Sequence, residues 1–345
     1  MEKALINILR EKSVSEDLIS DVIASGYFLK TWVNPFEGKT YTTVSDKMYG
    51  NKQFSSSFEI EKFIKYIHGE NTFENYHKFK TYTVKTKNEI NEILNQSPRK
   101  NYISEEKMSF RGQPKEYKIK RKIPNPVRCD EDGNELSILP GAYRNKSFEI
   151  SLPSLFDEMM PRRFLSELEP NNPNVLFDSS YSHDIMRVQQ HYANQTEGLD
   201  ISFNIDTAIF FATHKLNTNS NGSKFYTKID KGNHDGVIYC FVFRDPPVKK
   251  TQYYIDSFSL FKTYTPERIL RQRCGLPLFS DYDRNIAICD IDCIIYLDKD
   301  FEDNKSLAPE YMFPSREEDK FYHKLLELKD KYKNSLNDVV VYEHQ

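Results

Sequence analysis

The sequence predicts an α+β fold: a mixed or antiparallel, split sheet with flanking helices, preceded by a mainly helical region at the N-terminus. Helical patterning comes first, because apolar residues recur every three or four positions in residues 5–23 and 58–67. Strand patterning begins near residue 107, and residues 237–243 form a mostly apolar run that is typical of a central strand. No run approaches the roughly 18 uncharged apolar residues of a membrane helix.

The composition indicates a folded protein that stays in the cytoplasm. Hydrophobic residues make up 38% of the 345 residues, and the 22 Tyr and 24 Phe argue against disorder. The N-terminus lacks the long apolar centre of a signal peptide, and no membrane association is expected. The five cysteines show neither disulfide nor zinc spacing, and no metal site is expected. Because the net charge is −3, contact with nucleic acid would need a local basic patch.

The first region, residues 1–77, is expected to be mainly helical. Apolar residues at helical spacing predict short helices around residues 5–9 and 18–23, and Ser15 is expected to begin the second. Residues 27–50 are rich in aromatic and β-branched residues with turn-forming residues between them, which predicts a small hairpin. A further helical pattern follows, and the domain boundary is placed near residue 78.

The main domain is expected to span residues 78–300. It opens with a helical pattern at residues 88–94, and its first strand follows residue 107. The remaining expected elements are helices over 155–169, 181–192 and 208–211, and strands over 237–243 and 286–297. Residues 301–345 are expected to form a C-terminal amphipathic helix, over 317–328, and a tail.

A dense basic stretch follows the first strand of this domain. It consists of Lys115, Lys118, Lys120, Arg121 and Lys122. Lysines on an edge strand protect it against pairing with other chains, which is one interpretation. The other is a strip that contacts the phosphate backbone of nucleic acid, RNA more than DNA, with Tyr117 available to stack on a base. The sequence leaves both interpretations open.

A polar, turn-rich segment lies directly before an apolar helix in the middle of the chain. Residues 188–202 hold His191, Tyr192, a Thr, an Asp and Ser202. A buried polar group without a partner costs roughly 1–3 kcal/mol, so these side chains must bond to one another, to the backbone or to a ligand. One interpretation is a ligand cleft. The other is an ordinary helix entry, in which Ser202 or Asn204 caps the first turn and His191 is a satisfied core residue.

Four short motifs occur in a fixed order around this segment. They are Ser109-Phe110-Arg111-Gly112-Gln113, Pro140-Gly141-Ala142-Tyr143-Arg144, Gln190-His191-Tyr192 with Thr196, Leu199, Asp200 and Ser202, and Arg268-Ile269 with Gln272 and Gly275. In this order they resemble the FRG domain family, named for its Phe-Arg-Gly tripeptide. The chain departs from the family pattern at Ala193, Asn194, Gln195, Glu197 and Ile201, has Ser202 in place of Thr, and has one more residue between Gln272 and Gly275.

The same motifs are also similar to those of mono-ADP-ribosyltransferases. The shared features are the aromatic-Arg-Gly tripeptide, Ser202 followed by Ala six and Phe nine positions later, and a Glu-Arg-Ile-Leu that begins at Glu267. The resemblance implies an ADP-ribosyltransferase-like sheet and NAD as co-substrate. It also implies that Arg111 holds a phosphate or ribose of NAD, that Gly112 lets the dinucleotide approach the backbone, and that Ser202 braces the arginine. Glu267, with Gln272 as its rival, would contact the nicotinamide ribose.

The resemblances give a set of candidate site residues, several of which have a structural alternative. The catalytic candidates are Arg111, Glu267 and Gln272, and the cofactor-binding candidates are Gly112, Gln113, Gln190, His191, Tyr192, Thr196, Asp200 and Ser202. Arg111 is alternatively a buried ion-pair partner of Asp200, and Glu267 an acid that favours a helix start. His191 and Tyr192 either brace the loop or stack on nicotinamide or adenine.

The function that these resemblances imply is an ADP-ribosyltransferase that uses NAD to modify a macromolecule, as microbial toxins and antiviral effectors do. RNA is favoured slightly over protein as the substrate because of the basic stretch, and an inhibitory partner protein of the antitoxin type is implied. The alternative is a non-catalytic FRG module that binds a nucleotide or a protein as a sensor. A nuclease is disfavoured, because no carboxylate cluster with metal-site spacing stands out.

Overall fold

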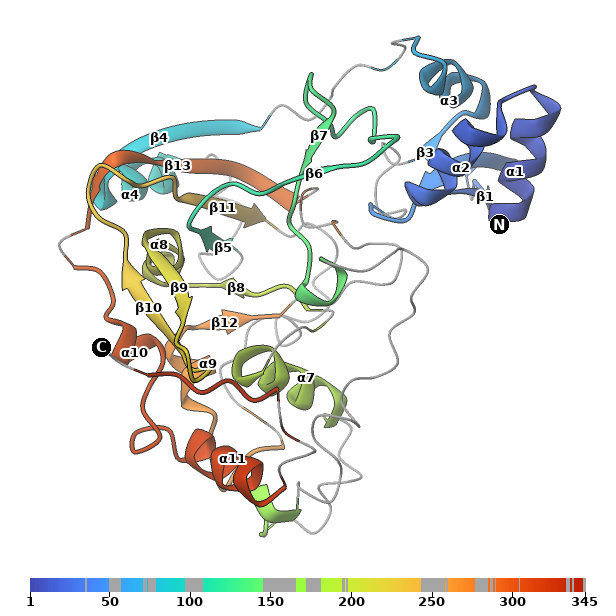
Figure 1. The fold of residues 1–345 in the computed structure, drawn as a ribbon. Helices are drawn as coiled ribbons and strands as arrows, with labels where there is room; N and C mark the ends of the chain where they lie inside the picture. The colour runs from blue at the N-terminus through green and yellow to red at the C-terminus, as the bar shows by residue number, and fades with distance from the viewer. Residues whose placement is uncertain are drawn as a thin grey trace. The chain divides into compact units, whose positions relative to one another are not determined.

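The computed structural model divides into two compact units, which are described separately (Figure 1). The first consists of Met1–Phe79, Tyr117–Ser151 and Phe279–Cys289, and the second of Lys80–Glu116, Leu152–Leu278 and Asp290–Gln345. The chain therefore crosses between the units more than once, whereas the sequence predicted three consecutive segments. The structure describes residues 1–34, 36–49, 57–70, 73, 79–96, 108–144, 166–171, 181–193, 196, 198–242, 258, 260–276, 285, 288, 290–303, 305–332, 336 and 338–343.

The first unit contains short helices and a small antiparallel sheet. Helix α1 spans Glu2–Glu11 and α2 spans Glu16–Ala24, and Ser15 caps α2 by accepting a hydrogen bond from the backbone N–H of Leu18, as predicted. The predicted hairpin is formed by β1 (Tyr27–Val33) and β2 (Thr40–Asp46), which pair antiparallel. The other elements of this unit are β3 (Ser57–Phe58), α3 (Ile60–Ile67), β6 (Lys118–Lys120), β7 (Asn134–Leu136) and the single turn η4 (Gly141–Tyr143).

A buried ion network ties the segment between β6 and β7 to the hairpin of this unit. The side chain of Arg121 is 5% exposed, and its Nη2 lies 2.8 Å from carboxylate oxygens of both Asp46 and Glu135. Its Nη1 also donates to the backbone carbonyl of Ser25 at 2.6 Å. A buried cation needs this number of partners to offset its loss of hydration. Arg121 is therefore a structural residue, unlike the exposed Lys120 and Lys122 beside it.

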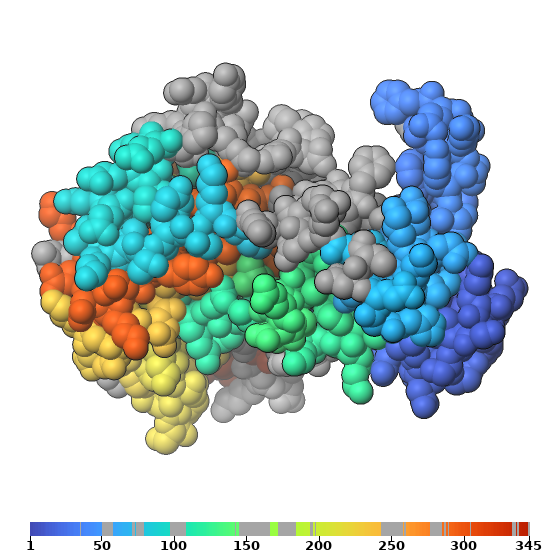
Figure 2. Space-filling view, turned by 90° about the horizontal axis from the view of Figure 1, so that it is seen from above, coloured from blue at the N-terminus to red at the C-terminus, as the bar shows by residue number. Residues whose placement is uncertain are grey.

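A six-stranded mixed sheet forms the centre of the second unit, and the predicted α+β class is confirmed. Neighbouring strands pair antiparallel except the last two, which are parallel. On the face of this unit seen in Figure 2, β4 (Lys80–Thr86) and the following helix α4 (Lys87–Gln96) are at the surface beside β13 (Ile291–Glu302). The strand order is β12 (Cys274–Gly275), β8 (Ile201–Ser202), β5 (Met108–Gln113), β11 (Val237–Val242), β13 (Ile291–Glu302) and β4 (Lys80–Thr86).

Helix α8 (Ile205–Thr213) packs closely against one face of this sheet, and glycine makes the close approach possible (Figure 1). Ala208 and Ala212 of α8 share an apolar core with Phe110 of β5. A Cβ atom on Gly112 would lie 1.8 Å from the carbonyl oxygen of Ala208, and one on Gly236 would lie 2.4 Å from that of Ala212. Small residues on both sides therefore let the helix backbone lie almost directly on the strands.

A second apolar core joins α7 (Tyr181–Tyr192), α9 (Glu267–Arg271) and α11 (Lys320–Lys331). At its centre Arg268 is 0% exposed, and its Nη1 donates to the backbone carbonyl of His191 at 2.7 Å. Its guanidinium carbon lies within 5.4 Å of the ring centres of Tyr192, Phe313, Tyr322 and Tyr342. We call Arg268 and these four rings the arginine cage.

The C-terminal segment closes the arginine cage. It supplies the ring of Tyr342, and the backbone N–H of Val340 donates to the carbonyl of Tyr192 at 2.8 Å. The neighbouring N–H of Tyr342 donates to the hydroxyl of Tyr322 at 3.0 Å. The last two carbonyls of α7 are therefore bound by Arg268 and by Val340, from two distant parts of the chain.

Most predicted elements of this unit are present, with shifted ends. The helix predicted over 181–192 is α7, the strand predicted over 237–243 is β11, and the strand predicted over 286–297 is β13, which begins and ends later. The predicted C-terminal helix is α11, which begins at Lys320 because Asp319 caps it. Residues 155–165 of another predicted helix lie outside the described residues. No helix in the described ranges is long and apolar enough to cross a membrane.

Candidate functional site

Successive side chains of β5 point to alternate faces of the sheet, so Arg111 points to the face opposite α8. Phe110 lies in the core under α8, and Gly112 faces the helix backbone. The residue between them must point the other way, and Ser109 and Gln113 share its face. The Phe-Arg-Gly tripeptide thus has a local explanation, because the aromatic ring and the glycine accommodate the helix while the arginine serves the other face. The bare Cα of Gly112 makes room for α8, which is a different reason for glycine from the approach of a dinucleotide.

Side chains from three segments of the chain converge beside Arg111. We call Arg111, Gln190, His191, Thr196 and Asp200 the central polar cluster. Arg111 donates from Nη1 to the backbone carbonyl of Asp200 at 2.6 Å. Gln190 donates from Nε2 to the carboxylate oxygen Oδ2 of Asp200 at 2.7 Å. Thr196 donates to Oε1 of Gln190, and Nε2 of His191 lies 3.4 Å from Oδ1 of Asp200. Strand β5, the end of α7 and the loop before β8 therefore meet at Asp200, and five candidate site residues lie together.

His191 is buried and neutral in this cluster. Burial lowers its pKa, and the positive charge of Arg268 acts in the same direction, whereas Asp200 and a hydrogen bond with Gln272 raise it. The side chain of His191 is only 4% exposed, but that of Asp200 is 36% exposed. The cluster therefore reaches solvent at the side chain of Asp200, although Oδ1 of this residue is buried, and the neutral imidazole of His191 can accept a hydrogen bond.

The lowered pKa of His191 predicts a pH dependence of stability. The unfolded chain binds a proton to this residue below about pH 6.5, before the folded protein does, so the stability contributed by neutral His191 is lost as the pH falls below that value. We expect the free energy of unfolding to fall less steeply between about pH 7 and pH 5 in His191→Gln than in the wild type. Urea unfolding at several pH values measures this. The exposed His68→Gln is the control, and equal slopes for His191→Gln and the wild type would contradict the assignment.

Ser202 lies near Arg111 in the sheet but points to the other face. Its cross-strand partner in β5 is Phe110, and cross-strand partners share a face. Its hydroxyl donates to the backbone carbonyl of Gln272 at 2.7 Å and accepts from the N–H of Asn204 at 3.0 Å. Asn204 is the residue that caps α8. Within the described residues no hydrogen bond joins Ser202 to Arg111. The arginine instead donates to the backbone carbonyl of Asp200.

The two candidates for the ribose contact, Glu267 and Gln272, differ in how their side chains are used. The amide of Gln272 donates to the carbonyl of Met312 at 2.8 Å and accepts from the thiol of Cys274 at 3.5 Å, and the residue is 2% exposed. Glu267 is the first residue of α9, is half-buried, and makes no side-chain hydrogen bond or ion pair within the described part of the chain. The carboxylate of Glu267 is therefore the one available for a ligand.

Tyr192 belongs to the protein core, which leaves bracing as its role. Its ring is 0% exposed and packs against Phe321 and against Arg268 in the arginine cage. Its hydroxyl donates to the carboxylate of Asp319 at 2.5 Å, and burial raises its pKa well above the ordinary value. Helix α7 therefore presents Gln190 and His191 to the central polar cluster and Tyr192 to the core.

Tyr239 faces Arg111 and was not identified from the sequence. In the antiparallel register of β5 and β11, Tyr239 is the cross-strand partner of Arg111. Its side chain is completely buried, and its hydroxyl has no hydrogen-bond partner in the described residues. The apolar run of residues 237–243 contained no signal for this, because only the pairing register decides which residue of β11 faces the arginine.

The lysines of the basic stretch are exposed, in contrast to Arg121. They are Lys115, Lys118, Lys120 and Lys122. Lys118 forms an ion pair with Asp130 at 2.9 Å. Lys118 and Lys120 lie on strand β6, which pairs only with β7 among the described residues and so is an edge strand. Edge protection and phosphate contact therefore both remain open for them.

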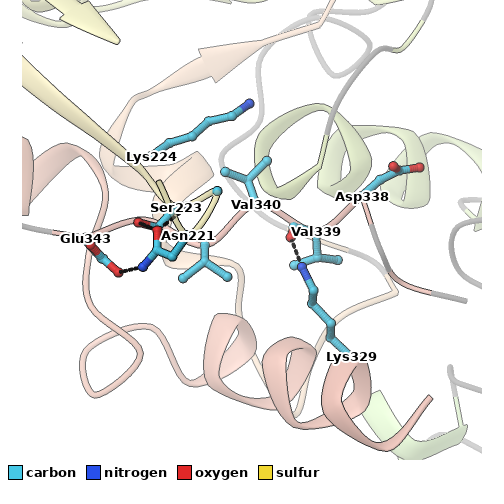
Figure 3. A pocket seen from close by; sticks show the side chains of 10 residues that line it. Asn221, Ser223, Lys224, Lys329, Asp338, Val339, Val340 and Glu343 are labelled. Carbon is cyan, nitrogen blue, oxygen red and sulfur yellow. Dashed lines mark hydrogen bonds between the residues drawn. The ribbon is translucent and has the colours of Figure 1, made fainter. Parts of the chain in front are cut away.

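A pocket of about 450 Å³ lies in the second unit beside the C-terminal segment (Figure 3). On one side Ser223 donates to Asn221 at 2.7 Å, and Asn221 donates to Glu343 at 3.1 Å. On the other side Lys329 donates to the carbonyl of Val339 at 2.5 Å. None of the candidate site residues lines this pocket, so it is separate from the central polar cluster.

Comparison with known proteins identifies no relative: no family model, no curated protein and no solved structure matches this chain. The resemblance to the FRG domain family therefore rests on its motifs. Of the third motif, Asn194, Gln195 and Glu197 lie outside the described residues.

Proposed function

We propose that this protein binds NAD beside Arg111 and transfers the ADP-ribose group to a macromolecule. The observation that supports this most directly is the central polar cluster, in which an arginine on an inner strand meets Asp200 and His191 from separate segments. A guanidinium is always charged and offers several N–H donors in one plane, which suits the oxygens of a pyrophosphate. The carboxylate of the partly exposed Asp200 adds an acceptor for ribose hydroxyls.

The proposed transfer breaks one bond and forms one. A nucleophile of the acceptor attacks the C1′ carbon of the nicotinamide ribose, and the bond from that carbon to the nicotinamide nitrogen breaks. Nicotinamide leaves as a neutral molecule with the bonding electron pair, and the acceptor gives up one proton to the solvent. Positive charge develops on the ribose as the bond weakens, so a carboxylate near that sugar accelerates the step. Glu267 is assigned this role because its side chain is not engaged elsewhere in the described residues.

Glu267→Gln is expected to lower the rate of nicotinamide release by about 10²–10³-fold while changing the affinity for NAD very little. The lost interaction contributes most in the transition state, when the ribose carries charge. Single-turnover release of labelled nicotinamide and calorimetric titration with NAD measure the two quantities.

Gln272→Ala is the companion variant of Glu267→Gln, and we expect it to reduce stability, because Gln272 binds the carbonyl of Met312. Full activity of Glu267→Gln together with a folded, inactive Gln272→Ala would transfer the ribose contact to Gln272.

The acceptor is proposed to be RNA in preference to protein. The support is local, since Lys115, Lys118, Lys120 and Lys122 are exposed while the net charge of the chain is −3. The resemblance to toxins and antiviral effectors adds an inhibitory protein partner to the proposal. Incubation of the protein with labelled NAD and separate pools of RNA, DNA and protein identifies the acceptor.

The second candidate function is a non-catalytic nucleotide sensor. It is favoured by Ser202 and Gln272, whose polar atoms are hydrogen-bonded inside the protein and so are not directed at a substrate. Binding of NAD without release of nicotinamide in the presence of every pool would support the sensor over the transferase.

A further inference from the structure

Three other polar side chains share the face of the sheet to which Arg111 points. Ser109 and Gln113 flank the arginine along β5, and Tyr239 lies opposite it on β11. They are 0%, 7% and 0% exposed. The hydroxyl of Ser109, Oε1 of Gln113 and the hydroxyl of Tyr239 each lack a hydrogen-bond partner in the described part of the chain. We call Ser109, Arg111, Gln113 and Tyr239 the polar row.

The polar row is unusual for the interior of a sheet. Buried polar side chains in proteins nearly always have a partner, because an unbonded donor or acceptor away from water costs free energy. Other described residues also hold such atoms, but in the polar row three of them surround one arginine on one face of the sheet. Their neighbours on the same face are apolar, since Val237 and Phe241 are the cross-strand partners of Gln113 and Ser109. An apolar surround with a few convergent polar groups is typical of a site for a small ligand.

We propose that the polar row binds a nucleotide, with Arg111 at a phosphate and the other three side chains at ribose hydroxyls or a base amide. This inference rests on the proposed function and extends its site from the central polar cluster along β5 to β11. The chemistry matches, because Oε1 of Gln113 accepts from a hydroxyl or an N–H, while the hydroxyls of Ser109 and Tyr239 both donate and accept. Burial raises the pKa of Tyr239, so its hydroxyl keeps its proton and can donate.

Tyr296 provides a matched comparison on the neighbouring strand. Its ring lies on the same face as Tyr239, because Tyr296 pairs with Val237 in the register of β11 and β13. Its hydroxyl, however, donates to Glu116 at 2.7 Å. One of the two tyrosines is therefore satisfied within the protein, and the other is not.

The test compares Tyr239→Phe with Tyr296→Phe by thermal unfolding and by calorimetric titration with NAD, ADP-ribose and AMP. Tyr239→Phe should unfold at the same or a higher temperature than the wild type, because it removes an unbonded buried hydroxyl. It should also bind the nucleotides about 3- to 10-fold more weakly, the effect of one hydrogen bond. Tyr296→Phe should unfold at a lower temperature and bind with unchanged affinity.

The outcomes separate this inference from the proposed function. The proposed nucleotide binding at the polar row is wrong if Tyr239→Phe is as destabilised as Tyr296→Phe, or if it binds all three nucleotides like the wild type. Tyr239-dependent binding without nicotinamide release in any acceptor pool supports the polar row and overturns the transferase. A wild type that binds none of the three nucleotides overturns both.

Discussion

Arg111→Ala is expected to reduce nicotinamide release to background, a loss of at least about 10²–10³-fold, while the protein stays folded. Arg111 contributes the one permanent positive charge of the central polar cluster, and no neighbouring group of that cluster can replace it at a pyrophosphate. Arg111→Lys should not restore activity, because an ammonium group is a point charge that cannot form two parallel hydrogen bonds. The activity of both variants is measured as nicotinamide release, and their affinity for NAD by calorimetric titration.

The stability of Arg111→Ala decides between the site and the ion-pair interpretation. In the structure Nη1 donates to the backbone carbonyl of Asp200, and the loss of a hydrogen bond from a charged group costs up to about 3 kcal/mol of unfolding free energy. A structural buried ion pair would lose more, about 3–5 kcal/mol, because Asp200 would be left without its partner. Urea unfolding of Arg111→Ala distinguishes the two. A loss above about 3 kcal/mol would support the ion pair and remove the main argument for a ligand at this residue.

Gly112→Ala is expected to destabilise the second unit by at least about 3 kcal/mol, a large effect for one methyl group. The added Cβ would lie 1.8 Å from the carbonyl oxygen of Ala208 and 3.0 Å from the backbone nitrogen of Ala212. Both are helix backbone atoms, so the strain cannot be relieved by rotating a side chain. Either α8 must move away from β5 or the strand must bend. Thermal or urea unfolding measures the loss.

Ser109→Ala is the control for Gly112→Ala, because it changes the same strand on the opposite face. It removes a buried hydroxyl that has no partner in the described residues, and we expect stability within about 1 kcal/mol of the wild type. A Gly112→Ala variant as stable as the wild type would show that the tripeptide needs its glycine for a reason other than α8.

The sequence predicted the elements of the second unit where the pattern is local and strong. Helix α7, helix α8 and strand β11 were predicted, because their apolar spacing depends only on neighbouring residues. The order of the motifs, and not a physical pattern, predicted that Arg111, Thr196, Asp200 and Ser202 converge with Glu267 or Gln272; the structure brings Arg111, Thr196 and Asp200 into one cluster, whereas Ser202 points to the other face.

The direction of individual side chains could not be predicted. Ser202 points away from Arg111 because it pairs with Phe110, and Tyr239 faces Arg111 because of the β5 to β11 register. Both depend on which strands become neighbours, and a shift of one residue would reverse both. Arg121 belonged to a basic stretch in the sequence, and it is buried because Asp46 and Glu135 come from distant positions. Long-range pairing therefore limits prediction more than local propensity does.

The arginine cage has a consequence for the order in which the protein can mature during synthesis. The ribosome makes α7 long before it makes Val340 and Tyr342. Val340 binds the carbonyl of Tyr192, and the ring of Tyr342 covers Arg268. A nascent chain that has just completed β13 holds every candidate residue of the central polar cluster, yet the end of α7 still lacks one of its two long-range donors. The hydrogen bond from Val340 to the carbonyl of Tyr192 thus forms only after translation has passed residue 340, well after the residues of the central polar cluster have been made.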